Sequence, residues 1–117
     1  MAGSTYKSMY WTVSSSDPRL KENIKPCTTN ALELINKLSM YEFDWINDKK
    51  HWKAGLIAPE VYEIEPELAI KPDDEEEGYW GIDDFYLTSI QTKAIQELSA
   101  ENDELKSQIF TLNSRIA

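Results

Sequence analysis

The sequence contains one cysteine and one histidine among its 117 residues. A single cysteine, Cys27, excludes an internal disulfide and a cysteine cluster for zinc. A single histidine, His51, means that a histidine-rich metal centre or a cysteine–histidine protease would have to be built from isolated, distant residues. We therefore predict no metal site and no cofactor, and we expect Cys27 to be partly buried and His51 to lie at the surface.

Basic residues are scarce as well, because 12 lysines and arginines face 21 aspartates and glutamates and the formal net charge is -9. This charge repels nucleic acid, and no basic stripe offsets it. The sequence shows no signal peptide and no apolar run of about 18 residues, so we expect neither export by this segment nor membrane insertion. A hydrophobic content of 41% in a chain of this length suits one domain with a modest core.

Local patterns in the first half of the chain predict a helix followed by a β-hairpin. Asn30 and the two threonines before it are good helix caps, and the apolar spacing that follows predicts a helix over 30–40. Apolar and polar residues then alternate over 41–45, and a second short run covers 51–57. These two runs are predicted strands that pair across the turn between them.

The second half begins with a short helix and an acidic loop. Pro59 can open a helix that ends before Pro66. Residues 71–78 carry five consecutive carboxylates, but they lack the alternating oxygen ligands and internal glycine of a calcium loop. We interpret them as a solvated connection that leads into a short strand over 78–82.

The last helix, predicted from Asp83 or Asp84 onward, carries a heptad pattern. Glu101 at a g position and Lys106 at the next e position can pair across a parallel interface. Residues 85–94 do not keep the heptad register and are expected to pack on the globular part. The oligomerisation positions are Ile95, Asn102, Ile109 and Ile116 at a, and Leu98, Leu105 and Leu112 at d.

A serine and a lysine stand five residues apart, Ser16 and Lys21, where patterned sequence begins. A serine attacks an amide when a base takes its proton, and a lysine amine acts as that base when its pKa is lowered, to which the nearby cation Arg19 can contribute. Pro18 biases Asp17 toward extended geometry, and five extended residues would separate serine and lysine by roughly 16 Å. Either the chain turns here, or the lysine comes from a neighbouring subunit.

Four separated blocks of sequence stand out in order along the chain: SDPRLKENI at 16–24, FDW at 43–45, GLIAPEV at 55–61 and PEL at 66–68. Together they resemble the intramolecular chaperone auto-processing domain of phage tailspikes, tail fibres and endosialidases. The resemblance covers residues 16–117 and implies a homotrimer that assembles an upstream fibre and then cuts itself off. It implies an α+β fold, a small helix and β-hairpin globular part followed by a long C-terminal helix in a parallel trimeric coiled coil.

The resemblance also implies a domain organisation and a place of action. Residues 1–16 would be the stub of the upstream fibre or spike, and the aromatic and β-branched residues within 9–13 by themselves predict a strand there. Residues 17–82 would be the globular chaperone part, and residues 83–117 the helix with the coiled coil. The domain would act in the host cell cytoplasm during virion assembly, after which the upstream product goes to the virion tail and the domain is released.

The site implied by the resemblance is a Ser/Lys dyad that acts once. Ser16 would be the nucleophile and Lys21 the general base, with the cut between Ser16 and Asp17. Arg19 and Glu60 would support them, Arg19 at the oxyanion and Glu60 by orienting the lysine or a turn. Pro59 stands where the family usually has glutamine.

Several alternatives stay open from the residues alone. Isoleucine at a, leucine at d and one asparagine at a favour two strands on peptide rules, whereas the resemblance implies three, which we follow. The serine could instead act on the Ser15–Ser16 bond or on a neighbouring chain. The domain could also be a non-catalytic trimerisation module, or an acidic adaptor that binds proteins through residues 73–77.

Overall fold

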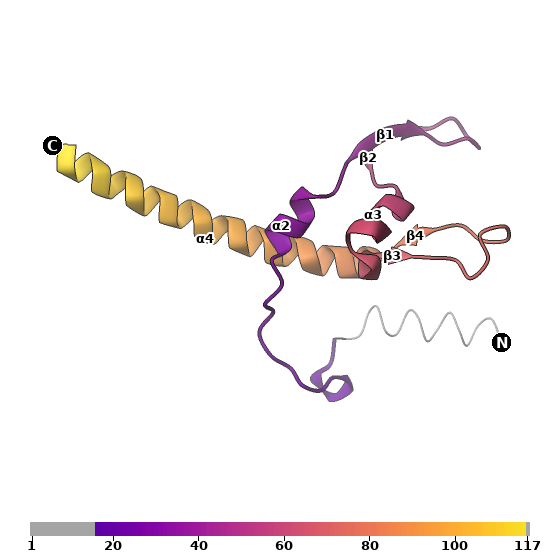
Figure 1. Ribbon diagram of the computed structural model, residues 1–117, viewed down its shortest axis with the longest axis horizontal. Coiled ribbons are helices and arrows are strands. Elements are labelled where there is room, and N and C mark those ends of the chain that lie inside the picture. Colours follow the sequence, from indigo (N-terminus) through magenta and orange to yellow (C-terminus); the bar gives the residue numbers. More distant parts are fainter. Residues whose placement is uncertain (1–15, 117) are drawn as a thin grey trace.

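A computed structural model describes residues 16–116, and the strand predicted over 9–13 lies outside them. Short helices and two small hairpins gather around one end of a single long helix, α4 (Asp84–Ile116), as Figure 1 shows. The other end of α4 extends well beyond these elements. The α+β class, with a small helix and hairpin part before a long helix, is confirmed.

Helix α4 has 33 residues and is about 50 Å long at 1.5 Å per residue. It begins where the sequence predicts, because the carboxylate of Asp83 accepts a hydrogen bond from the Tyr86 N–H at 3.0 Å and caps the first turn. The Tyr86 hydroxyl donates to Glu67 at 2.8 Å, which raises the pKa of Tyr86 to about 12 and ties this turn to the globular part. No helix within residues 16–116 is long and apolar enough to cross a membrane.

The predicted helix over 30–40 is shorter in the structure, where α2 spans Ala31–Asn36. After Asn36 the N–H groups of Lys37 and Leu38 bond to carbonyls three residues back, which closes the helix with a tighter turn. Residues 37–40 then connect α2 to the first strand, which begins at Tyr41. Asn30 makes no side-chain capping bond, contrary to the sequence prediction.

The predicted hairpin is confirmed as β1 (Tyr41–Asp44) paired antiparallel with β2 (His51–Gly55). One face carries the aromatic rings of Phe43, Trp45 and Trp52, whose centroids lie 5.0 to 5.9 Å apart. This face is only half buried, since each tryptophan remains 45% exposed. Gly55 leaves room for the Phe43 ring, since a Cβ atom at this position would lie 2.5 Å from it and the ring would have to move.

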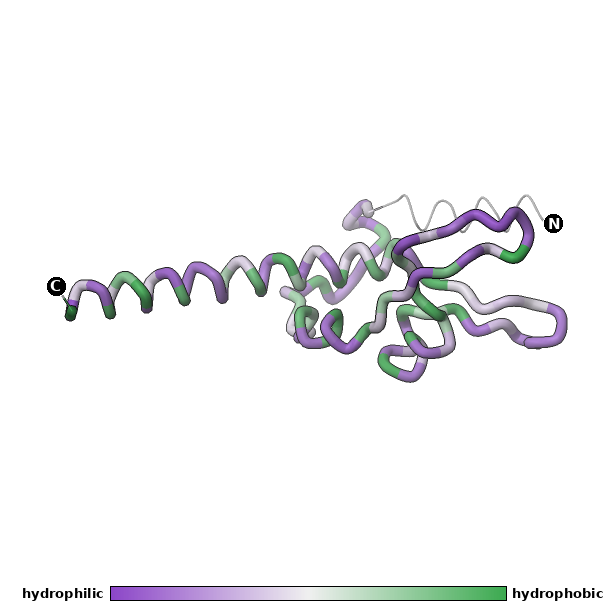
Figure 2. The backbone as a smooth tube through the Cα atoms, turned by 90° about the horizontal axis from the view of Figure 1, so that it is seen from above, coloured by the Kyte–Doolittle hydropathy of each residue, from purple (hydrophilic) through white to green (hydrophobic). Residues whose placement is uncertain are grey.

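Helix α3 (Ala58–Ile64) opens with Pro59 at its start, as predicted. It is followed by the 3₁₀ turn η2 (Pro66–Leu68) and by β3 (Ala69–Ile70). Strand β3 pairs with β4 (Gly81–Ile82) in a second small hairpin, of which the sequence predicted only the later strand. The acidic loop connects the two strands, and both hairpin loops project away from α4 (Figure 2).

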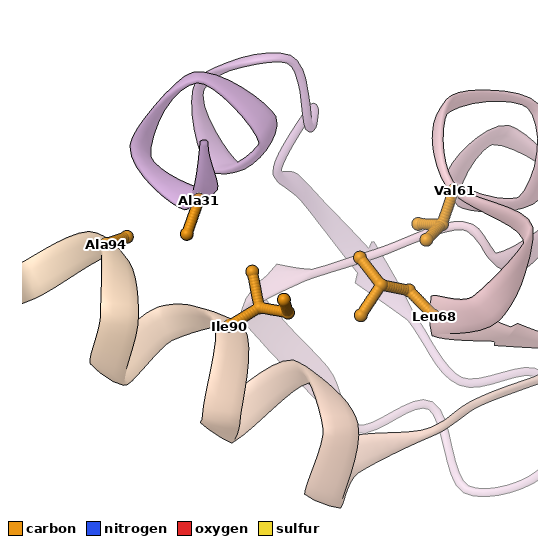
Figure 3. Close-up of a cluster of buried hydrophobic side chains, with 5 residues drawn as sticks. All are labelled: Ala31, Val61, Leu68, Ile90 and Ala94. Atoms are coloured by element: carbon orange, nitrogen blue, oxygen red, sulfur yellow. The ribbon is translucent and has the colours of Figure 1, made fainter. Parts of the chain in front are cut away.

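The core is small and lies where α2, α3 and η2 meet the first turns of α4 (Figure 3). Leu68 is completely buried, and Val61 and Ile90 approach it from α3 and α4. Ala31 of α2 lies against Ala94 of α4, and the two small side chains allow the helices to approach closely. This confirms that the out-of-register part of α4 packs on the globular part.

One burial prediction is wrong, because Cys27 is exposed and not partly buried. The segment that carries it leaves α2 and runs outward, away from the core (Figure 1). Phe85, at the start of the part of α4 that packs on the globular part, keeps 51% of its surface exposed, because the buried face of α4 begins with Leu87 and Ile90. His51 is exposed, as predicted.

His51 lies between two carboxylates on the face of the hairpin opposite the aromatic rings. Its Nδ1 is 2.6 Å from Asp44 Oδ1, and its Nε2 is 2.9 Å from Glu42 Oε1. An ionised carboxylate only accepts hydrogen bonds, so both ring nitrogens donate at once only in the imidazolium form. The pKa of His51 is therefore raised, chiefly by Glu42 and then by Asp44.

Replacing Leu68 with alanine is expected to lower the free energy of unfolding by about 2–5 kcal/mol, because it leaves a cavity at the centre of the core. Urea unfolding followed by circular dichroism measures the change. Ile46→Ala is the control, since Ile46 is 84% exposed and its loss should cost less than about 0.5 kcal/mol. Equal losses in the two variants would contradict the position of the core.

The β1–β2 hairpin is expected to weaken as the pH rises. The pKa of His51 is raised in the folded state above the ordinary 6.5, so its stabilising contribution is complete below 6.5 and is lost as the pH passes the raised value. Amide-exchange protection of β2 and the NMR titration of the His51 ring measure the effect. The same pH dependence of amide protection in the variant His51→Gln as in the parent would contradict the role of His51.

Candidate active site

Residues 16–30 form an arm that leaves the globular part before α2 and runs outward (Figure 1). All of its residues are exposed except Asp17, which is half-buried. Near its outer end the chain folds into a single 3₁₀ turn, η1 (Pro18–Leu20). The arm therefore presents a small ordered turn to solvent, at a distance from the core.

The turn is held by its own residues. Pro18 has the φ angle that the first position of a helical turn needs. The carboxylate of Asp17 accepts hydrogen bonds from the backbone N–H of Arg19 at 2.8 Å and from its guanidinium Nη2 at 2.8 Å. The Arg19 side chain holds the pKa of Asp17 below its ordinary value. The guanidinium that was expected near an oxyanion is thus paired with Asp17 in the single chain.

This turn brings the predicted serine and lysine together. Lys21 Nζ donates a hydrogen bond to Ser16 Oγ at 2.8 Å. Of the two alternatives left by the sequence, the chain takes the turn, and the contact forms within one chain. The distance is within the range over which a hydroxyl proton can pass to a base.

The surroundings of this pair are open. Ser16 and Lys21 are both exposed, and the described hydrogen bonds of residues 31–116 do not include either side chain. A hydrated ammonium group has no lone pair with which to accept a proton. Removal of water from the amine would favour the neutral form that a general base requires. The described part of one chain therefore places Lys21 Nζ against Ser16 Oγ, but it does not shield the lysine amine from water.

Glu60, the other supporting residue expected from the sequence, lies on α3. Its Oε1 accepts a hydrogen bond from the Tyr41 hydroxyl at 2.6 Å, which raises the pKa of Tyr41. This bond ties the start of β1 to α3. The structure therefore shows Glu60 bound to the base of the hairpin, and its hydrogen bond is not with Lys21.

Two residues of α4 that the sequence analysis did not single out bond to the backbone where the arm joins α2, at Thr29 and Leu32, which we call the root of the arm. Glu97 Oε2 accepts a hydrogen bond from the backbone N–H of Leu32 at 2.7 Å, in the first turn of α2. Lys93 Nζ donates to the carbonyl oxygen of Thr29 at 3.4 Å. The only sequence signal for them is a lysine four residues before a glutamate on one helix face.

One carboxylate of the acidic loop, that of Asp74, bonds to the loop's own backbone. Asp74 Oδ1 accepts from the N–H of Glu76 at 2.9 Å, and the Asp74 carbonyl oxygen accepts from Gly78 at 2.9 Å. These bonds close a turn of the kind that aspartate favours. Within residues 16–116, no three histidine, cysteine, aspartate or glutamate side chains are grouped so as to hold a metal ion.

The heptad positions of α4 form an uncovered seam in the single chain. They lie on the part of the helix beyond Ala94, the last buried residue of α4. Hydrophobic segments recur along this part of the helix in Figure 2. The seam consists of Ile95, Leu98, Asn102, Leu105, Ile109, Leu112 and Ile116, all of them exposed.

Residues 16–70 match the model of a family that bears a peptidase name and is described as the chaperone of endosialidase. The chain is also similar to "Long tail fiber protein Gp37" of Enterobacteria phage M1, with 32% identity over 105 residues that cover 86% of this chain and 42% of that protein. The protein of the same name in Enterobacteria phage Ox2 matches with the same identity and coverage. The chain thus spans about two fifths of the length of the curated relatives it matches.

Proposed function

Since residues 16–70 of this chain match the chaperone-of-endosialidase family, we propose that the chain is the intramolecular chaperone of a phage tail fibre or tailspike. It trimerises the fibre and then releases itself by autoproteolysis near Ser16–Asp17. The observation that carries the proposal is the 2.8 Å contact between Lys21 Nζ and Ser16 Oγ, inside the matched segment. In this proposal residues 1–16 are the fibre stub, 17–82 the globular chaperone part and 83–117 the oligomerisation helix.

The first step is assembly through α4. The exposed seam is apolar at all but one of its heptad positions, and parallel packing of copies would remove this surface from water. Fibre chains must pair strands between subunits, and such long-range pairing is slow because chain entropy is lost before contacts form. A clamp that holds three chain ends together raises their local concentration and speeds that step.

The second step is cleavage. Lys21 takes the proton of Ser16 Oγ, which attacks a carbonyl carbon; the carbon–nitrogen bond breaks, and the proton passes to the new amine. Water then hydrolyses the serine ester. A hydroxyl that attacked the carbonyl of its own residue would close a four-membered ring. Attack by Ser16 on the equivalent bond of a neighbouring copy avoids that ring, as does attack on the Ser15–Ser16 bond.

Assembly also supports the chemistry. The contact between Ser16 and Lys21 exists in one chain, but both side chains are exposed there. A neighbouring subunit that covers the turn would strip water from the lysine amine and favour its neutral form. Cleavage would then follow assembly in the host cell cytoplasm, with the fibre passing to the virion tail and this domain released.

A second function of another class is a non-catalytic trimerisation module. The observation that favours it is the Asp17–Arg19 pair, which by itself explains why a capped turn stands at this position. On this alternative the serine and lysine are surface residues of a packing turn. Substitution of Ser16 separates the two functions.

Ser16→Ala and Lys21→Ala are each expected to abolish self-cleavage, because one removes the nucleophile and the other the base. Intact-mass measurement under denaturing conditions at neutral pH should show a fragment beginning at Asp17 in the parent and only the full mass in both variants. A fragment that begins at Ser16 would move the cut to the preceding bond. Full mass in the parent as well would favour the non-catalytic module.

Leu105→Glu is expected to break the oligomer, because it places a charge at a d position in the middle of the seam. In a Ser16→Ala background, which keeps the chains uncut, light scattering coupled to gel filtration should show about three times the chain mass of 13.5 kDa without Leu105→Glu and the chain mass alone with it. Ser107→Glu adds the same charge at an f position, off the seam, and should leave the trimer intact. A parent mass of twice the chain mass would favour the peptide rules over the family expectation.

A further inference from the structure

Lys93 and Glu97 together form a clamp between α4 and the root of the arm. Lys93 Nζ lies 3.3 Å from Glu97 Oε1, while the other carboxylate oxygen of Glu97 accepts from Leu32 N–H at 2.7 Å. Lys93 also reaches the Thr29 carbonyl at 3.4 Å. The backbone N–H of Leu32 is the main reason that the pKa of Glu97 lies below its ordinary value.

The clamp is shielded from solvent, unlike the ordinary surface pairs of this chain. The side chains of Lys93 and Glu97 are only 26% and 24% exposed, whereas those of the pair Lys37–Glu33 are 59% and 66% exposed. Glu97 also supplies the side-chain acceptor that the first turn of α2 lacks, since Asn30 makes no capping bond. The root of the arm therefore depends on a side chain of α4.

The same turns of α4 carry both the clamp and the start of the seam. Successive helix residues are rotated by about 100°, so Lys93 and Glu97 both lie nearly opposite the seam residue Ile95. Leu98 is about 140° from Lys93 and about 100° from Glu97 around the helix. Packing of copies along the seam would thus leave the clamp free on the outer face. When assembly fixes the position of α4, the hydrogen bond from Lys93 to Thr29 fixes the position of the end of the arm next to α2 as well.

We propose that the Lys93–Glu97 clamp is the positioning element that couples the oligomerisation helix to the Ser16–Lys21 turn. This inference rests on the proposed function. Within residues 16–116, the hydrogen bond that joins the arm itself to α4 is the one from Lys93 to Thr29. Without the clamp, the short-range Ser16–Lys21 contact survives, but the turn loses its fixed place relative to the neighbouring copies.

The test compares rates of self-cleavage in clamp variants of the 117-residue chain. Glu97→Ala and Lys93→Met are expected to slow cleavage about tenfold to a hundredfold, the effect of a misplaced reacting group. Glu97→Gln keeps an acceptor oxygen for the Leu32 N–H and should fall between Glu97→Ala and the parent. The matched control is Glu104→Ala, at the same heptad position one repeat later on the exposed part of α4, which should cleave at the parent rate.

A second readout follows the arm without cleavage chemistry. In a Ser16→Ala background, trypsin should cut after Arg19 and Lys21 faster when Glu97 is replaced by alanine than when Glu104 is. Light scattering should show an unchanged oligomer mass. Loss of the oligomer in both Glu97→Ala and Glu97→Gln would make Glu97 a residue of the fold and overturn the coupling.

The outcomes separate the two proposals. A parent chain that is never cut would overturn the proposed function and this inference with it. A parent that is cut, a Ser16→Ala variant that is not, and clamp variants that are cut at the parent rate would overturn only the coupling. Slow cleavage in the clamp variants with an intact oligomer is the result that supports it.

Discussion

The contact of Ile90 and Ala94 with Leu68 and Ala31 divides α4 into two parts with different tasks. Up to Ala94, the helix is the surface on which α2 and η2 pack, and α3 and β3 pack in turn on η2. Beyond Ala94, the described part of the chain contributes no buried residue, although large apolar side chains continue to the end of the helix. Two of the five residues of the buried cluster, Ile90 and Ala94, come from α4, so the core does not exist without this helix.

The single chain leaves two features unfinished in the same way. The seam of α4 exposes isoleucine and leucine at heptad spacing, and the arm exposes a serine paired with a lysine. Apolar surface of this regularity is stabilised by a partner helix, and a lysine base is favoured by loss of water. Contact with further copies would satisfy both needs, so the proposed chaperone and cleavage activities have a common structural requirement.

Local pattern was sufficient to predict the parts of the fold that depend on neighbouring residues in sequence. The hairpin, the start of α3 at Pro59 and the cap of α4 at Asp83 follow from periodicity, proline and capping rules, and the structure confirms them. The end of α2, the β3–β4 pairing and the exposure of Cys27 depend on where distant segments meet, and sequence reasoning missed them.

In the site, the length of the chain between Ser16 and Lys21 was enough to predict that a turn must bring them together. The hydrogen bond from Leu32 to Glu97 could not be predicted in this way, because the two residues are 65 positions apart in sequence.

The locality of the Ser16–Lys21 contact limits how the proposed cleavage can be timed. A contact between residues five apart, closed by a turn with its own aspartate cap, does not wait for the rest of the chain to fold. Bringing the two side chains together therefore cannot be the step that assembly controls. What assembly can still change is the water around the lysine and the position of the turn relative to a bond in a neighbouring chain. The first depends on cover from another copy, and the second depends on whatever anchors the arm, which in this structure is α4.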